Sequence, residues 1–331
     1  MNTDKLQQKL EELYDPTLKM NLKDSRGIKH LAYDEKEGIV TLIVSIGKLG
    51  GEEEKYLRRE IARIVKIDFG YKRLRLQTEE SKIESSITKK PINFIGVISG
   101  KGGVGKSSIA ANIAYALKNK GKKVGIIDAD IYGSSIPTIL GVPHQHPIYD
   151  ENRKIIPIEK DGIELISTEF FTEESQPVLW RGALLNSMLN HFFYDLAWSE
   201  DIEYVIIDFP PGTGDIALDL KNIVPQSKML LVTTPHPSAS HVAVKAGTAA
   251  KTLGHELLGV IENMSYYVNP ISKEHEYIFG SGGGKDVATE LEVPLIAKLE
   301  IAQPKNNTDI FSDDEQNGKI YLEIADFIIN N

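Results

Sequence analysis

The chain has 331 residues, 41% hydrophobic and 26% charged, which fits a soluble protein with room for two domains, and its formal net charge of −9 argues against a broad nucleic-acid-binding surface. Because the sequence contains no cysteine, disulfides, thiolate nucleophiles and cysteine-ligated zinc or iron–sulfur clusters are excluded within this chain. Apolar runs are too short for a membrane span and the first residues lack a signal-peptide pattern, so we expect a cytoplasmic protein with no membrane partner.

Residues 1–78 are predicted to form a small α/β unit. Its elements, in order, are a helix at 5–13, a turn at Asp15-Pro16, a β-branched strand at 39–45, a helix at 52–67 and an edge strand at 71–77. This order and the Asp15-Pro16 turn resemble the PaaD-like domain of iron–sulfur assembly proteins, and a generic α/β adaptor is the alternative. Residues 79–90 are polar and lack a packable face, so we predict a linker there and a second domain at 91–331.

The second domain opens on a glycine-rich segment that fits G-x-x-x-x-G-K-[ST], the pattern of a phosphate-binding loop. A predicted buried strand at 92–99 precedes it and a predicted helix follows it, so backbone N–H groups and the helix N-terminus would face the phosphates. We expect Lys106 to contact the β- and γ-phosphates and the Ser107 hydroxyl to bind Mg²⁺; a glycine turn without a ligand is the alternative. The residues predicted to bind the nucleotide here are Gly100, Lys101, Gly102, Gly103, Val104, Gly105, Lys106, Ser107 and Ser108.

Lys101 is a second lysine within this loop. The sequence G-K-G-G-V-G-K-S resembles the deviant Walker A loop of the ATPase class that contains ParA, MinD and the nitrogenase iron protein. That resemblance implies that the early lysine reaches across a dimer to the partner's phosphates. A cation supplied in this way stabilises the transferring phosphoryl group, as an arginine finger does, and such a finger increases the rate roughly 10³–10⁵-fold. A solvated loop lysine is the alternative.

Two later strands end in carboxylates beside this loop. The predicted strand at 123–128 runs into Asp128 and Asp130, which we expect to manage Mg²⁺ and an attacking water; a charged turn is the alternative. The predicted strand at 204–208 ends in Asp208 after four apolar residues, the Walker B pattern, which makes Asp208 a metal ligand together with Ser107. A strand-end cap is the alternative for Asp208. The proline- and glycine-rich loop at 209–215 is predicted to be a switch that senses the γ-phosphate.

From residue 91 onward strands and helices alternate, which predicts an α/β fold with a doubly wound, mostly parallel sheet of the P-loop NTPase type. Further strands are predicted at 228–233, 257–262 and 293–298, and a closing helix at 321–329. Asn263 follows one of these strands, and its amide can both donate to and accept from an adenine edge, so we predict a base contact. The glycine run at 279–285 precedes a helix and is considered as a second phosphate site.

Five motifs in this order resemble the Mrp/ApbC ATPases. They are Gly100 to Ser107, Asp128 to Gly133, Val178 to Gly182, Pro210 to Asp215 and Glu262 to Tyr266. The resemblance implies a homodimer, Mg-ATP binding with slow hydrolysis, and carriage of a [4Fe–4S] cluster. It also implies a C-x-x-C pair shortly after the N-M-S motif, where this chain has Asn269 and Ser272 instead.

Cluster carriage by the usual chemistry is therefore not expected, because amide and hydroxyl groups are hard, weak ligands for cluster iron. The cysteine-less pattern resembles SalA-like members, which the resemblance associates with ATP-dependent transcriptional control. We predict an ATPase switch that acts on a DNA or protein target, and an iron–sulfur cluster carrier is the alternative. The basic run at 118–123 is the candidate DNA contact, although such a run is more often a solvated helix end; a scaffold acting through the first unit is a further interpretation.

Overall fold

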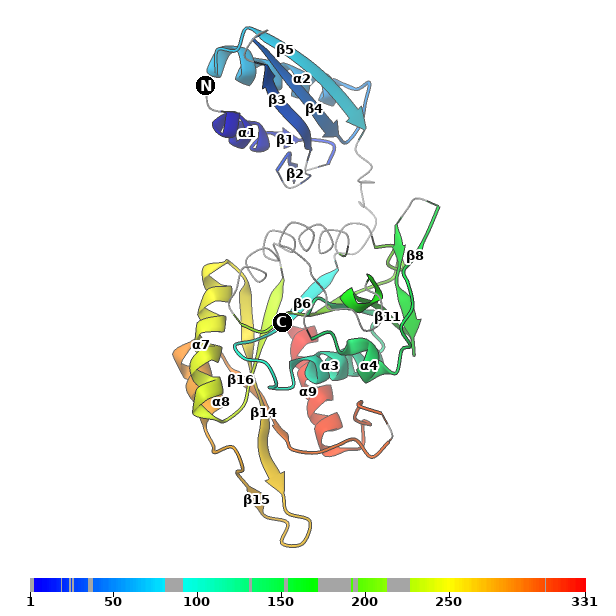
Figure 1. Cartoon of the computed structure of the whole chain (residues 1–331), viewed down its shortest axis with the longest axis vertical. Helices are drawn as coiled ribbons and strands as arrows, with labels where there is room; N and C mark the ends of the chain where they lie inside the picture. Colours follow the sequence, from blue (N-terminus) through cyan, green and yellow to red (C-terminus); the bar gives the residue numbers. More distant parts are fainter. Residues whose placement is uncertain are drawn as a thin grey trace. The chain divides into compact units, whose positions relative to one another are not determined.

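The computed structural model describes all residues except 1–2, 19, 24, 26, 35–37, 81–91, 131–132, 152–153, 172–191, 193–195, 213–226 and 307. Its contacts divide the chain into two compact units, Met1–Lys89 and Lys90–Asn331, which are described separately (Figure 1). Three predicted features lie largely outside the described residues. They are most of the linker, the motif at 178–182 with the helix expected after it, and the second half of the switch loop.

The first unit is a three-stranded sheet with helices against one face. The central strand β4 (Ile39–Ile46) pairs antiparallel with β3 (Ile28–Asp34) and parallel with the edge strand β5 (Arg73–Glu80). The other elements are α1 (Thr3–Glu11), β1 (Tyr14–Asp15), β2 (Met20–Asn21), α2 (Glu52–Arg63) and its π-helical continuation η1 (Ile64–Asp68). Alternate β4 side chains are fully buried with leucines of α1 and α2, as a strand with one covered face requires. Strand β3 was not predicted from the sequence.

The predicted linker begins too early by two residues. Strand β5 continues through Glu79 and Glu80, which pair with Ser45 and Ile46 of β4. The polar composition of this stretch is compatible with an edge strand, because one side and one face of such a strand meet water. Strand pairing, which is not visible in the local sequence, therefore decides where the first unit ends.

The Asp15-Pro16 turn has a structural basis. The Asp15 carboxylate is fully buried and accepts hydrogen bonds from the backbone N–H groups of Thr17 (2.8 Å), Leu18 (3.1 Å) and Gly47 (2.9 Å). It thus closes its own turn and joins that turn to the segment after β4. The assignment of this unit as PaaD-like stays a prediction.

The second unit contains a nine-stranded, mostly parallel sheet. Its strand order is β10 (Ile158–Lys160), β11 (Ile163–Ser167), β7 (Val124–Asp128), β12 (Tyr204–Asp208), β6 (Asn93–Ser99), β13 (Lys228–Thr233), β14 (Glu256–Val268) and β15 (His275–Glu276), with β16 (Leu295–Glu300) also paired to β14. Among the strand pairs that the structure describes in this sheet, only β10–β11 and β14–β15 are antiparallel. Two short strands, β8 (Ile148–Tyr149) and β9 (Ile155–Ile156), form a separate hairpin.

Helices cover both faces of this sheet, so its central strands are continuous apolar runs. Figure 1 shows α7 (Pro237–Thr252) and α8 (Gly283–Glu290) on one side, and α3 (Lys106–Asn119), α4 (Ile136–Leu140) and α9 (Gln316–Asn330) on the other. A short 3₁₀ helix, η2 (Thr168–Phe171), follows β11. The predicted doubly wound, mostly parallel α/β fold is confirmed, while α7 and the β10–β11 hairpin were not anticipated. Within the described residues, no helix combines the length and apolarity needed to cross a bilayer.

The sheet topology brings three chain segments to one edge. Strands β6, β7 and β12 are parallel neighbours, and Asp128 and Asp208 are register partners at the ends of β7 and β12. The loop that follows β6 leads into α3 at the same edge. Carboxyl ends of parallel strands are where open α/β sheets bind ligands, so this edge is where a functional site is expected.

Candidate functional site

The loop from Gly100 to Ser107 joins β6 to α3, and its shape depends on glycine. Gly103 and Gly105 have φ of 78° and 86°, in the left-handed region that side chains other than glycine rarely adopt, and Gly105 is the N-cap of α3. At Gly100 the backbone of α7 comes so close that a Cβ would lie 2.3 Å from the carbonyl carbon and oxygen of Val242. The loop therefore presents a helix N-terminus, which favours anions.

Lys106 is the buried cation of this loop. Its Nζ lies 2.6 Å from Oδ1 of Asp208, 3.3 Å from Oδ2 of Asp130 and 3.4 Å from Oγ of Ser107, while only 6% of its side chain is exposed. The structure thus brings together four residues that the sequence analysis assigned to phosphate and metal chemistry. Arriving phosphates would compete with these two carboxylates for the same ammonium group.

Asp128 is fully buried and held by hydrogen bonds. Oδ1 accepts from the backbone N–H of Asp130 at 3.2 Å, and Oδ2 accepts from the N–H groups of Ser135 and Ile136, each at 3.2 Å, and from Oγ of Ser167 at 3.1 Å. Burial and then the neighbouring charge of Asp208 raise the pKa of the Asp128 carboxyl to about 8, against the lowering effect of its hydrogen bonds and of Lys106. Both carboxyl oxygens of Asp128 accept hydrogen bonds, so the described contacts give Asp128 a structural role: it joins the ends of β7 and β11 to the start of α4.

The two carboxylate oxygens of Asp208 differ in their contacts with the described residues. Oδ1 accepts from Lys106, whereas Oδ2 is buried and has no hydrogen-bond partner among the described residues. Burial raises the pKa of the Asp208 carboxyl, although the charge of Lys106 opposes this. A buried carboxylate oxygen near the Ser107 hydroxyl fits Mg²⁺, which prefers oxygen ligands. Among the described residues, no group of three or more histidines or acids is placed to hold a metal by itself.

Of the remaining predicted loop residues, Val104 is buried and the others lie at the surface. Lys101 and Gly102 are exposed, and the backbone carbonyl of Lys101 accepts a hydrogen bond from Oγ of Ser99 at 3.0 Å. Ser108 is exposed too, and its carbonyl accepts from the side chain of Asn112 at 2.8 Å. An exposed Lys101 is free to reach outward, and its action in trans stays a prediction.

Asn263 of β14 contacts the loop through its side chain. Its Nδ2 donates to the backbone carbonyl of Val104 at 2.9 Å, across 159 positions of sequence. The predicted base contact stays a prediction, but the structure adds a contact that the sequence analysis did not foresee. Ser167, which holds Asp128, was also missed; its place at the end of an unpredicted strand explains why.

The second phosphate site considered at 279–285 is not supported by the structure. The N-terminus of α8 is occupied by the chain's own carboxylate, because Oε2 of the buried Glu262 accepts from the N–H of Gly284 at 2.5 Å. Oε1 of Glu262 accepts from Oγ of Ser265, also at 2.5 Å. An added anion would have to displace this carboxylate.

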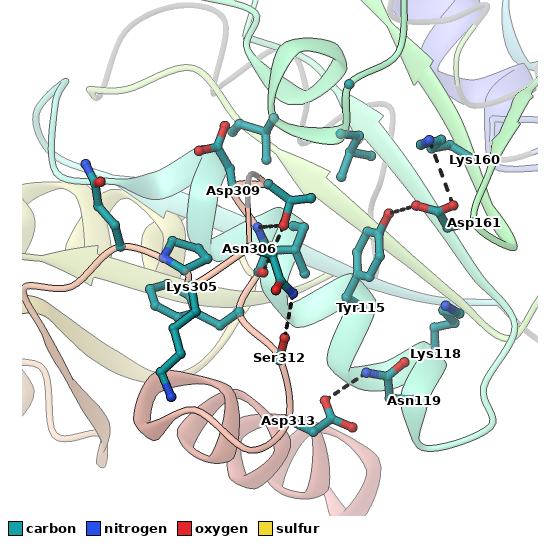
Figure 2. A pocket seen from close by; sticks show the side chains of 18 of the residues that line it. Tyr115, Lys118, Asn119, Lys160, Asp161, Lys305, Asn306, Asp309, Ser312 and Asp313 are labelled. Atoms are coloured by element: carbon teal, nitrogen blue, oxygen red, sulfur yellow. Dashed lines mark hydrogen bonds and ion pairs between the residues drawn. The ribbon is translucent and has the colours of Figure 1, made fainter.

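A cavity of about 1070 Å³ lies beside α3 (Figure 2). It is bordered by the second half of α3, the end of α4, the β10–β11 turn and the loop at 303–314. Asn112 of α3 holds that loop, since it donates to the carbonyl of Asp309 at 3.2 Å and accepts from the N–H of Phe311 at 2.9 Å. Polar groups on the wall pair with one another, as Tyr115 does with Asp161 at 2.7 Å. The loop at 100–107 does not line this cavity.

Comparisons with known proteins agree with this geometry. Residues 90–328 match the family model described as ParA, NUBPL iron-transfer P-loop NTPase. The chain is 38% identical to the iron-sulfur cluster carrier protein of Bacillus subtilis (strain 168), over 97% of this chain and 96% of that protein. It is 34% identical to the protein of the same name from Synechocystis sp., over 89% of this chain and 86% of that protein.

Solved structures show the same fold. A nucleotide-binding protein from Archaeoglobus fulgidus in complex with ADP is 29% identical, with a TM-score of 0.55 over 72% of this chain and 88% of that one. The cell division ATPase MinD of Pyrococcus furiosus, at 22% identity and a TM-score of 0.53 over 72% of this chain and 99% of its own, shows the fold alone.

The glycine loop at the start of α3 and the two acidic strand ends define a P-loop NTPase. Within that class, the matched family model and the full-length relatives show that the chain belongs to the Mrp/ApbC family of iron-transfer P-loop NTPases. The family resemblance found in the sequence is thereby confirmed.

Proposed function

We propose that this protein binds and hydrolyses Mg-ATP at the loop from Gly100 to Ser107. The observation that carries the proposal is the buried Lys106, which lies between two carboxylates at the start of α3. Lys106 and the loop N–H groups would hold the phosphates, and Ser107 and Asp208 would hold Mg²⁺. When bound, Mg²⁺ neutralises charge on the transferring phosphate. Asp130, 3.3 Å from Lys106, is the acid best placed to orient water, because Asp128 is committed to backbone hydrogen bonds.

The proposed switch is a homodimer in which Lys101 acts on the partner's phosphates. Its support is the exposure of Lys101 within a loop whose other lysine is buried. A cytoplasmic location stays a prediction.

Phosphate release from ATP, with Mg²⁺ and with EDTA, tests this function. We expect slow turnover that needs Mg²⁺ and disappears in Lys106→Ala and Asp208→Asn, while Lys120→Ala, a surface lysine, keeps the wild-type rate. Equal rates in the wild type and Lys106→Ala would assign the activity to a contaminant and contradict the proposal.

Cluster carriage is the second candidate function, and the names of the relatives favour it. However, the side chains of Asn269 and Ser272 in the hairpin after β14 are weak ligands for iron, and both already take part in hydrogen bonds. Oδ1 of Asn269 accepts from the N–H groups of Ile271 (2.9 Å) and Ser272 (3.1 Å), and its Nδ2 donates to Glu276 at 2.6 Å. Oγ of Ser272 accepts from the N–H of Glu274 at 3.3 Å. A carrier built on this chain would therefore need thiolates from another molecule.

Anaerobic iron–sulfur reconstitution separates the two candidates. Visible absorbance and iron per protein are measured after desalting, with and without a small external thiol. Retention of a cluster only with the thiol supports a carrier with borrowed ligands. No retention in either case supports a switch that handles other cargo, and retention without thiol contradicts the argument from missing cysteine.

The DNA-regulator prediction gains no support from the basic run at 118–123. Each lysine there has a neighbour that reduces its availability: Lys118 lies over the ring of Tyr115 at 5.3 Å, Lys120 pairs with Asp326 at 2.7 Å, Lys122 with Glu203 at 3.5 Å and Lys123 with Asp201 at 3.4 Å. Nearby carboxylates lower the local positive potential that phosphate binding requires. The regulator role stays a prediction, which a salt-dependent gel shift with ATP present would test.

A further inference from the structure

Strand β14 changes course beside the phosphate-binding loop. Its pairing with β16 is in regular register at Ile261 and Glu262 and then shifts before Tyr266. Within this irregular stretch Met264 has φ of 53°, a left-handed conformation that is uncommon for a residue other than glycine. Such a conformation persists only where the surroundings impose it. The surrounding structure therefore imposes the irregular stretch from Glu262 to Ser265, and Asn263 lies inside it.

The side chain of Asn263 contacts the loop at the turn formed by Val104 and Gly105, where Gly105 has a left-handed backbone conformation. Nδ2 donates to the carbonyl of Val104 at 2.9 Å, and a Cβ on Gly105 would lie only 2.2 Å from the same nitrogen. Gly105 is the left-handed N-cap from which α3 and Lys106 begin. The Asn263 amide thus binds the peptide between Val104 and Gly105. Gly105 in turn sets the direction in which the phosphate-binding N–H groups and the Lys106 side chain point.

The backbone that carries Asn263 is itself anchored. The neighbouring Glu262 is fully buried, and its two oxygens accept hydrogen bonds from Gly284 of α8 and from Ser265, while Lys298 of β16 lies 3.7 Å away. Hydrogen bonds to a carboxylate are stronger than those between neutral groups, so this arrangement fixes the irregular stretch firmly. Asn263 consequently acts on the loop from a rigid base formed by α8 and β16.

We infer that Asn263 is a positioning residue for the phosphate-binding loop, which sets the Val104–Gly105 turn so that the loop binds a polyphosphate whatever its base. This inference rests on the proposed function, because it takes the triphosphate as the ligand. It differs from the base contact predicted from the sequence in one measurable respect. A positioning residue affects ATP, GTP and a base-free polyphosphate equally, whereas a base contact leaves the base-free polyphosphate unaffected.

The variants Asn263→Asp and Asn263→Ala remove the donor, and the first keeps the shape of the side chain. Asn93→Asp is the matched control, because Asn93 also donates to a backbone carbonyl, that of Glu203 at 3.2 Å, at the opposite end of β6. Calorimetric titrations measure the affinity of each protein for Mg-ATP, Mg-GTP and inorganic tripolyphosphate. Hydrogen exchange of peptides covering 100–107 reports the order of the loop without any ligand.

We expect both Asn263 variants to lose about tenfold in affinity for all three ligands, the effect of one hydrogen bond with its unsatisfied partner. The ATP-to-GTP ratio should match the wild type, loop exchange should be faster, and Asn93→Asp should change nothing. Loss confined to ATP, or unchanged tripolyphosphate affinity and loop exchange, would overturn the inference. Wild-type protein that binds none of the ligands would instead refute the proposed function. If Asn263→Ala unfolds, the ligand-free loop exchange of Asn263→Asp at a wild-type melting temperature decides, because the added negative charge by itself weakens the binding of any anion.

Discussion

The ammonium nitrogen of Lys106 lies 2.6 Å from a carboxylate oxygen of Asp208, which is 102 positions away in the chain. Both side chains are buried, so neither charge is compensated by water. Removing one partner of a buried pair leaves the other uncompensated, and this costs more than the pair itself contributes. The contact therefore links phosphate binding to the stability of the sheet edge.

Lys106→Ala should destabilise the fold as well as abolish nucleotide binding. We expect the free energy of unfolding to fall by about 3 kcal/mol, because Asp208 then remains buried without its cation. Urea unfolding measures this change. Lys120→Ala, which breaks the more exposed pair with Asp326, should cost less than about 1 kcal/mol. Equal losses in the two variants would show that burial does not strengthen the Lys106 pair.

The contribution of Asp128 to the free energy of unfolding should decrease as pH rises between about 4 and 8. The pKa of the Asp128 carboxyl is about 8 in the folded chain and about 3.9 in an unfolded one, so the folded state holds a proton that the unfolded state releases. The stabilisation from this proton is complete below about pH 4 and is lost as pH approaches 8. Urea unfolding at several pH values should show a shallower slope for Asp128→Asn. An unchanged slope would mean that Asp128 is ionised throughout.

Lys101→Ala should keep most nucleotide affinity and lose hydrolysis. An exposed side chain contributes little to the fold, whereas a cation donated in trans increases phosphoryl transfer roughly 10³–10⁵-fold. Equilibrium binding and phosphate release measure the two effects separately. Lys305→Ala, another exposed lysine, serves as control. Wild-type turnover by Lys101→Ala would exclude a role for this lysine in catalysis.

Gly100→Ala should be destabilising, while Gly102→Ala in the same loop should be tolerated. A methyl group at Gly100 would meet the Val242 backbone at 2.3 Å, which forces α7 or the loop to move, and we expect a loss of about 1–3 kcal/mol. At Gly102 the nearest atom would be 3.9 Å away, on Pro211. Thermal melting of the two variants tests this, and similar melting temperatures would show that α7 yields easily.

Asn269→Cys combined with Ser272→Cys should allow a cluster to bind without external thiol. Thiolates supply the soft ligands that the wild-type amide and hydroxyl lack. Reconstituted variant protein should retain iron and visible absorbance after desalting, with Ser265→Cys and Ser108→Cys as a control pair placed elsewhere. A colourless double variant would indicate that the hairpin at 268–275 is not a cluster position in this chain.

The α/β class, the family and the position of the glycine loop could all be predicted from the sequence. These follow from local rules: glycines allow the left-handed turns at Gly103 and Gly105, and apolar runs such as Tyr204–Asp208 form strands buried on both faces. Asp128 and Asp208 could be assigned to one sheet edge because parallel strands end together.

The contacts that hold these groups in place are visible only in the folded chain. Asn263 reaches Val104 across 159 positions, Ser167 holds Asp128 from a strand that the sequence analysis did not identify, and Glu262 occupies the helix end considered for a second phosphate. Each contact depends on strand register and helix packing between distant segments. Local sequence patterns specify backbone conformation but not which distant side chain meets it, so these residues could be located only after the chain had been folded.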